Sequence, residues 1–163
     1  EPAAIADLDV VLLDDHSESV EREIRKYNME GTVRTHPRIP YLSCLALLRD
    51  ADVLLVLDAP FDVNLFFPSK LVDYLGARRP ILGLTPLKGP TAQILRSMGQ
   101  PVVSPGEYDD VAHELSELWR AWRDGTLTKR RPRSEAVRTF SVEIISEKLI
   151  DIFNKVCGYR GRI

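Results

Sequence analysis

The sequence predicts an α/β fold: a doubly wound parallel sheet of about five strands, with helices on both faces. Three observations predict it. Five short apolar runs alternate with segments of helical period from one end of the chain to the other. The runs are continuous rather than alternating in polarity, as expected of strands buried on both faces of a parallel sheet. With 163 residues, the chain has the length of one domain.

The predicted strands lie at residues 8–13, 32–35, 53–57, 80–84 and 101–103. Helices are predicted between them, at 17–27, 41–49, 69–77 and 91–98, and after them, at 108–123 and 142–156. In the segment 108–123, Val111, Leu115, Leu118 and Trp122 recur at spacings that place them on one helical face. Strand and helix alternating in this way imply right-handed crossovers.

The organisation changes near residue 125. We expect residues 1–125 to form the core, and residues 126–163 to form a linker and a C-terminal helix that packs on it. Gly125 ends the preceding helix, and four cations then crowd together: Lys129, Arg130, Arg131 and Arg133. The simplest interpretation is a solvated loop. The alternative is a contact with anionic lipid headgroups, which attract such clusters.

Composition excludes few classes of function. Charged residues make up 28% of the chain and the net charge is −2, so no general attraction to nucleic acid is expected. Cys44 and Cys157 match no metal-ligand spacing and are expected to be reduced thiols. No apolar run is long enough for a membrane span, and the start has no signal-peptide pattern. We therefore expect a cytoplasmic protein.

One hypothesis starts from the stretch "VVLLDDH", which resembles the first strand of a phosphate-accepting receiver domain. Asp14 and Asp15 would be its acidic pair, Asp58 the phosphorylated residue and Thr85 the switch hydroxyl. However, Ser104 stands where such a domain needs a lysine to compensate the phosphoryl charge. The final predicted helix would also have no role. The receiver hypothesis is therefore the weaker alternative.

The segment "FFPSKLVDYLGARRPILGL" carries more chemistry. Pro68 suits a helix start, and Ser69 and Lys70 follow in the first turn. Free backbone N–H groups, the helix dipole and the lysine ammonium together favour a diphosphate there. Asp73 lies one turn further on the same face as Ser69, where its carboxylate could accept hydrogen bonds from ribose hydroxyls. The less specific alternative is a surface ion pair between Lys70 and Asp73. Gly76 and "ARRP" are expected to end the helix.

This segment resembles the nucleotide-binding signature in the C-terminal domain of GT-B-fold glycosyltransferases. The similarity is closest to the retaining family 4 group and its bacterial members that build cell-surface polysaccharides. "LDVVLLDD", "EGTVRTHPRIPYLSCLALLRDADVLLV" and "SVEIISEKLIDIF" match the same scheme, so the resemblance covers nearly the whole chain. It implies that residues 1–125 are a Rossmann-like domain that binds a nucleoside-diphosphate sugar, the donor substrate.

The resemblance also assigns roles to residues. Ser69 and Lys70 match the helix start that meets the diphosphate, and Asp73 matches the acid that binds the ribose. The loop 37–41, with Pro40 and Tyr41, matches the nucleobase pocket. Asp62 and Asn64 lie in the loop that approaches the donor sugar. No catalytic residue, cofactor or essential metal is implied. The base, the sugar and the acceptor stay open, and a sugar-nucleotide epimerase of the same fold is an alternative.

Two residues depart from the family pattern: Leu65 replaces a first acid, and Asp14 replaces a glycine near the phosphate. Matched to the family pattern, residues 1–163 are expected to lack the family's N-terminal acceptor domain and the first strand of the C-terminal domain. Without that central strand the expected order is 2-1-3-4-5. Either the strands close up around the gap, or the exposed edges support self-association. We expect the isolated chain to bind a donor without turnover, in the cytoplasm or at the inner face of the membrane.

Overall fold

The computed structural model describes residues 2–13, 18–62 and 66–158. Its strands are β1 (Val10–Leu13), β2 (Val33–His36), β3 (Leu54–Leu57), β4 (Ile81–Leu84) and β5 (Val102–Val103). Its helices are α1 (Pro2–Asp7), α2 (Glu18–Lys26), α3 (Tyr41–Asp50), α4 (Lys70–Ala77), α5 (Pro90–Ser97), α6 (Tyr108–Arg123), the 3₁₀ helix η1 (Leu127–Arg130), α7 (Ser134–Arg138) and α8 (Val142–Cys157). The predicted strands and main helices are confirmed; η1 and α7 were not predicted.

All strand pairs are parallel, which confirms the predicted fold class, but the strands form two sheets. β1 pairs with β2, with Val10 opposite Val33. β3, β4 and β5 form the second sheet in that order, with Leu54 opposite Ile81. Of the two alternatives given above, the closing of the strands around the gap into one sheet is not what the structure shows. In the described part of the chain β1 and β3 do not pair, and a cleft of about 790 Å³ separates them.

The three-stranded sheet has a core on each face, because successive side chains of a strand point to opposite sides. Leu54 and Val56 of β3 belong to one cluster with α3, α4 and α5, whereas Leu55 packs against the other cluster, with α6 and η1. The first cluster contains Leu48, Leu54, Val56, Leu71, Leu75, Ile81, Leu95 and Met98. The second contains Leu82, Val103, Leu118, Ala121 and Leu127. Helices thus cover both faces, as in a doubly wound fold.

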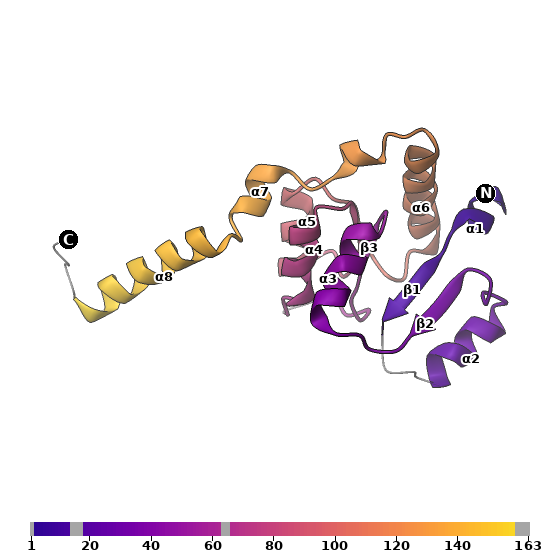
Figure 1. Cartoon of the computed structure of the whole chain (residues 1–163), viewed down its shortest axis with the longest axis horizontal. Coiled ribbons are helices and arrows are strands. Elements are labelled where there is room, and N and C mark those ends of the chain that lie inside the picture. Colours follow the sequence, from indigo (N-terminus) through magenta and orange to yellow (C-terminus); the bar gives the residue numbers. More distant parts are fainter. Residues whose placement is uncertain (1, 14–17, 63–65, 159–163) are drawn as a thin grey trace.

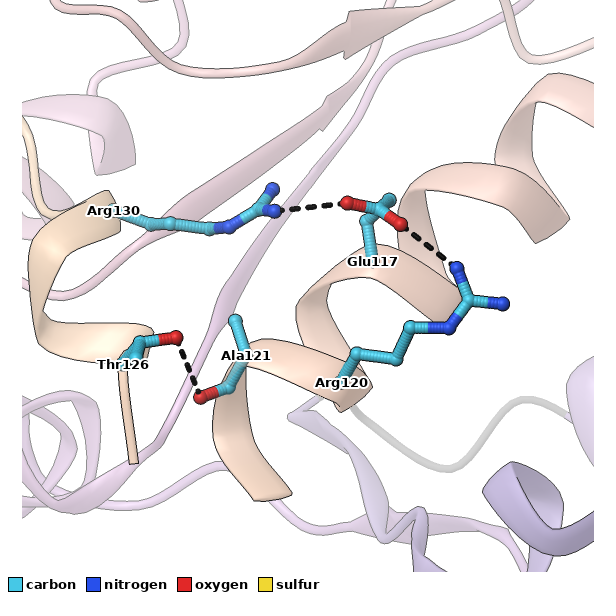
Figure 2. Close-up of polar contacts among 5 residues, drawn as sticks. All are labelled: Glu117, Arg120, Ala121, Thr126 and Arg130. Carbon is cyan, nitrogen blue, oxygen red and sulfur yellow. Dashed lines mark hydrogen bonds and ion pairs between the residues drawn. The ribbon is translucent and has the colours of Figure 1, made fainter. Parts of the chain in front are cut away.

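The segment predicted as a cationic loop is partly folded onto α6. Glu117 accepts hydrogen bonds from Arg120 at 2.8 Å and from Arg130 at 3.1 Å (Figure 2). The bond from Arg120, with that from Arg130, lowers the pKa of Glu117. Thr126 adds a bond from its hydroxyl to the carbonyl of Ala121 (Figure 2). Arg130 is therefore committed to an intramolecular partner, which leaves less charge for a lipid surface than the sequence indicates.

The last helix, α8, extends away from the rest of the chain (Figure 1). Ser141 caps its start by accepting a hydrogen bond from the amide of Ile144. This helix was expected to pack on the core. Its apolar stripe is exposed instead, and it consists of Val142, Ile145, Leu149, Ile152, Phe153 and Val156. The preceding α7 does reach the core, through Ala136 and Val137. No helix in the described ranges is both long and apolar enough to cross a bilayer.

α4 ends within the predicted stretch of Gly76 and "ARRP", and its C-cap residue is Arg78. Its φ of 55° lies in the left-handed region, which a residue with a Cβ adopts at a cost. We expect Arg78→Gly to raise the free energy of unfolding by about 0.5–1 kcal/mol, measured by urea denaturation. Asn28→Gly, at a φ of 53°, is the matched control. Its gain should be smaller because asparagine tolerates this region. Equal gains, or a loss at position 78, would contradict this account.

Candidate functional site

The helices α3 and α4 both begin at the carboxyl ends of the strands. α3 follows the loop after β2, and α4 follows the loop after β3. The cleft lies between β1 and β3. On one side of it β1 is followed outward by β2, and on the other side β3 is followed outward by β4 and then β5. Such a switch point, at the carboxyl ends of parallel strands, is where open α/β sheets bind ligands. The residues predicted to bind the donor therefore belong to the edge that favours a site.

The start of α4 presents a cation and a helix N-terminus. Ser69 and Lys70 are exposed, and Lys70 also lines the end of the cleft. The amides of Leu71 and Val72 already donate to the carbonyls of Pro68 and Ser69, at 2.9 and 3.1 Å. An anion at this helix start would therefore contact the Lys70 ammonium and the backbone N–H groups that precede Leu71, and the helix dipole would add to the attraction.

Tyr41 and Asp73 come together across the two helix starts. The Tyr41 hydroxyl donates a hydrogen bond of 2.8 Å to Oδ1 of Asp73. Within the described residues, Lys70 forms no ion pair with Asp73, so the surface ion pair weighed above is not seen. Oδ2 of Asp73 has no hydrogen bond from another described residue. The arrangement places one carboxylate oxygen beside an exposed aromatic ring and a lysine one turn away.

The same bond raises the pKa of Tyr41, because ionisation would remove the hydrogen bond and place a phenolate beside a carboxylate. We expect Asp73→Asn to lower the pKa of Tyr41, since that change removes the charge. An NMR titration of the tyrosine ring carbons measures it. Asp110→Asn, on α6, should leave the pKa unchanged. An unchanged pKa in Asp73→Asn would mean that the two side chains do not meet in solution.

The remaining predicted residues are distributed around this pair. Pro40 directly precedes α3 and is exposed beside Tyr41. Asp62 is exposed in the loop after β3 and bonds to none of the other predicted residues that the structure describes. Asn64 and Leu65 lie outside the described residues, as do Asp14 and Asp15. The structure thus joins Tyr41 with Asp73, which lies in the same helix start as Ser69 and Lys70, and it does not join Asp62 to them.

The loop between β3 and α4 contains aromatic residues to which no role was assigned from the sequence. Phe61 and Phe66 are 67% and 82% exposed at the same edge. The carbonyl of Phe66 accepts a bond of 3.4 Å from the hydroxyl of Thr91 in α5, and Phe67 stacks on Phe140 at 6.2 Å. The signal in the sequence was the pair of runs "APFD" and "FFP", which place Phe61, Phe66 and Phe67 in one loop. These contacts fix the entry to α4.

The pair that the receiver hypothesis needs is also in contact. Thr85, fully buried after β4, donates a hydrogen bond of 2.6 Å to Oδ2 of Asp58, which follows β3. A structural role explains this bond, because the hydroxyl of a buried threonine must find an acceptor. Ser104 still stands in the place of the lysine. Among the described residues no cluster of three or more His, Cys, Asp and Glu side chains could hold a metal ion.

Comparisons with known proteins show which solved structures have a similar fold. No protein-family model and no curated protein sequence matches the chain. Among solved structures, Anabaena HepE in complex with UDP-glucose is similar, with a TM-score of 0.69, 14% identity, and coverage of 94% of this chain and 43% of that one. Sucrose-phosphate synthase from Thermosynechococcus elongatus has a TM-score of 0.71, 14% identity, and coverage of 96% and 41%.

The chain therefore spans about two fifths of each of these two neighbours. Both neighbours are GT-B glycosyltransferases, as the sequence resemblance implied, whereas the assignment to family 4 stays a prediction. At this level of identity the likeness concerns the fold. The chain has the Rossmann-like α/β fold found in GT-B glycosyltransferases.

Proposed function

We propose that this chain is the donor-binding domain of a glycosyltransferase and that it binds a nucleoside-diphosphate sugar at the starts of α3 and α4. The hydrogen bond between Tyr41 and Asp73 carries the proposal. It holds a carboxylate one helical turn from Ser69 and Lys70, at the carboxyl edge of the strands. The fold likeness to HepE, solved with UDP-glucose, supports the same class of ligand.

Each residue has a defined task in this proposal. Lys70 and the start of α4 neutralise the diphosphate, since cationic groups and a helix dipole stabilise that charge without a metal. Asp73 accepts hydrogen bonds from the ribose hydroxyls. Tyr41 and Pro40 border the base, and Asp62 and Asn64 lie on the side of the sugar. The complete enzyme, with an acceptor domain, transfers the sugar to a glycan or lipid in cell-surface polysaccharide synthesis; residues 1–163 alone bind without turnover.

A thermal-melt panel tests the proposal. It compares uridine, guanosine and adenosine diphosphates, with and without Mg²⁺, and beryllofluoride with Mg²⁺. A ligand at about 100 times its Kd adds ~2.7 kcal/mol to the free energy of unfolding. For a domain of this size the midpoint should rise by several degrees. We expect one diphosphate to produce this rise without metal.

Two variants locate the effect. Lys70→Ala should lose most of the rise, because it removes the cation at the start of α4. Lys148→Ala, which removes an exposed lysine from α8, should keep it. If no diphosphate raises the midpoint, the donor-binding proposal fails. If only beryllofluoride with Mg²⁺ raises it, the chain is a receiver-like switch, and Asp58 with Thr85 becomes the relevant pair.

A further inference from the structure

The loop that leads into α4 is in contact with a residue from a distant part of the chain. Phe67 lies three residues before Lys70, the first residue of α4. Its ring stacks on the ring of Phe140, with 6.2 Å between the two centroids and 4° between the two planes. Parallel aromatic rings at such a separation attract each other beyond the area that they bury. The stack therefore joins the segment after α7 to the entry of the candidate site.

Phe140 is well supported on its own side of the stack. It packs against the first core cluster, as do Ala136 and Val137 of α7. Its amide donates a hydrogen bond of 3.0 Å to the carbonyl of Val137, and the amide of Ser141 donates one of 2.9 Å to the carbonyl of Arg138. Because both its side chain and its backbone are tied to α7 and the core, Phe140 is a fixed support for Phe67.

The loop on the other side of the stack is less well packed. Phe66 is 82% exposed and Phe67 is 38% exposed. The hydrogen bond from the hydroxyl of Thr91 to the carbonyl of Phe66 is long, at 3.4 Å. A loop with this much exposed surface gains a large share of its order from each contact with the core. The position of Phe67 therefore depends strongly on the ring of Phe140.

The position of Phe67 in turn determines where α4 begins. The next residue, Pro68, has a fixed φ, so the chain has little freedom between Phe67 and the helix. The carbonyl of Pro68 accepts a hydrogen bond of 2.9 Å from the amide of Leu71 and so belongs to the first turn of α4. Ser69 and Lys70 lie within that turn. A movement of Phe67 would thus move the two residues that are predicted to contact the diphosphate.

We propose that Phe140 is a positioning residue of the donor site: its ring holds Phe67, and with it the start of α4, in the conformation that receives the diphosphate. This inference rests on the function proposed above. Phe140 acts through Phe67 and is not a ligand itself. Without the stack the loop samples other conformations, and binding must restore the productive one at a cost in affinity. A stacked aromatic pair changes such an equilibrium by a factor of about two to ten.

Calorimetric titration of the full chain with uridine, guanosine and adenosine diphosphate tests this inference. Phe140→Leu keeps an apolar side chain against the core but removes the flat ring, and we expect it to weaken binding about two- to tenfold. Phe140→Tyr keeps the ring and should bind like the wild type. Val137→Ala is the matched control, because Val137 packs against the same core cluster. It should lower the Tm and leave the Kd unchanged. Unchanged binding by Phe140→Leu, or equal weakening by Val137→Ala, would overturn the proposal.

Amide hydrogen exchange in the ligand-free chain separates this inference from the proposed function. The amides of Leu71 and Val72 are bonded in the first turn of α4, and that of Gly83 is bonded in the sheet. In Phe140→Leu we expect the first two to exchange about two- to tenfold faster relative to Gly83, and in Val137→Ala we expect no relative change. If the wild-type chain binds no diphosphate, the proposed function fails, and these rates still decide whether Phe140 positions the start of α4. Unchanged relative rates in Phe140→Leu would overturn the inference whether or not a diphosphate binds.

Discussion

Replacing Gln100 by leucine is expected to lower the free energy of unfolding by about 2–4 kcal/mol, because one buried and one part-buried backbone group lose their hydrogen-bond partner. Gln100 is 4% exposed and follows α5. Its Oε1 accepts a hydrogen bond of 2.7 Å from the amide of Ile81, at the start of β4. Its Nε2 donates to the carbonyl of Arg130, at the end of η1, at 3.1 Å. One amide thus joins the central strand to the segment that follows α6.

Urea denaturation measures this loss. Gln93→Leu is the matched control, because Gln93 is exposed on α5 and its replacement should change stability by no more than about 0.5 kcal/mol. Leucine at position 100 keeps most of the volume, so a large loss reports the polar contacts rather than a cavity. If Gln100→Leu were as mild as Gln93→Leu, water or another group would have to satisfy Ile81 and Arg130.

Replacing Asp73 by asparagine is expected to weaken binding of the preferred diphosphate roughly ten- to hundredfold. In the proposed site, the carboxylate accepts hydrogen bonds from two ribose hydroxyls. Asparagine has the same shape, but it presents one acceptor and no charge, so the charge-assisted bonds are lost. Isothermal titration calorimetry on the wild-type chain and on the variant measures the ratio of dissociation constants.

Tyr41→Phe is the control for this change. It removes the hydroxyl that donates to Asp73 but keeps the aromatic ring, so both carboxylate oxygens become free for ribose. We expect its affinity to stay within a few-fold of the wild-type value. A second check uses the 2′,3′-dideoxy analogue, which should bind the wild-type chain and Asp73→Asn about equally. If the natural diphosphate also bound both proteins equally, Asp73 would not be the ribose ligand.

The sequence predicted the elements of the core well, because strands buried on both faces read as continuous apolar runs. "DVLLVL" and "PILGL" are typical of such strands, and β3 and β4 lie there. It could not predict how the strands group into sheets. In the described part of the chain β1 does not pair with β3, and no local signal in the sequence encodes the distance between these two strands. The number of strands and their parallel pairing were therefore predicted, whereas their division into two sheets was left open.

The short helices after α6 were predicted less accurately than the end of α4. That end was expected at Gly76 and "ARRP", and the helix does end there, with Arg78 rather than a glycine in the left-handed conformation. η1 and α7 were missed because the segment 124–135 has no helical period and many turn residues. The stripe of α8 was recognised correctly as one apolar face. Its exposure could not be predicted, because an amphipathic pattern indicates that one face of a helix tends to be buried but does not identify the surface that buries it.

The candidate site was predicted by its local pattern and completed by the fold. Ser69, Lys70 and Asp73 lie on one helix start and could be read from spacing alone. The bond between Tyr41 and Asp73 joins residues 32 positions apart, and only the fold brings α3 beside α4. No pattern in the sequence pointed to the buried Gln100, because its side chain stabilises the fold through hydrogen bonds to two backbone groups from distant segments.

Chemical-shift mapping with the preferred diphosphate tests the central claim most directly. Backbone amide resonances of the labelled chain are followed while the ligand is added without metal. The account predicts that the largest shifts fall on Tyr41 and on residues 69–73, and that they become much smaller in Asp73→Asn at a ligand concentration close to the wild-type Kd. Shifts that centre on Asp58 and Thr85 while residues 69–73 stay unchanged, or no shifts at all, would contradict it.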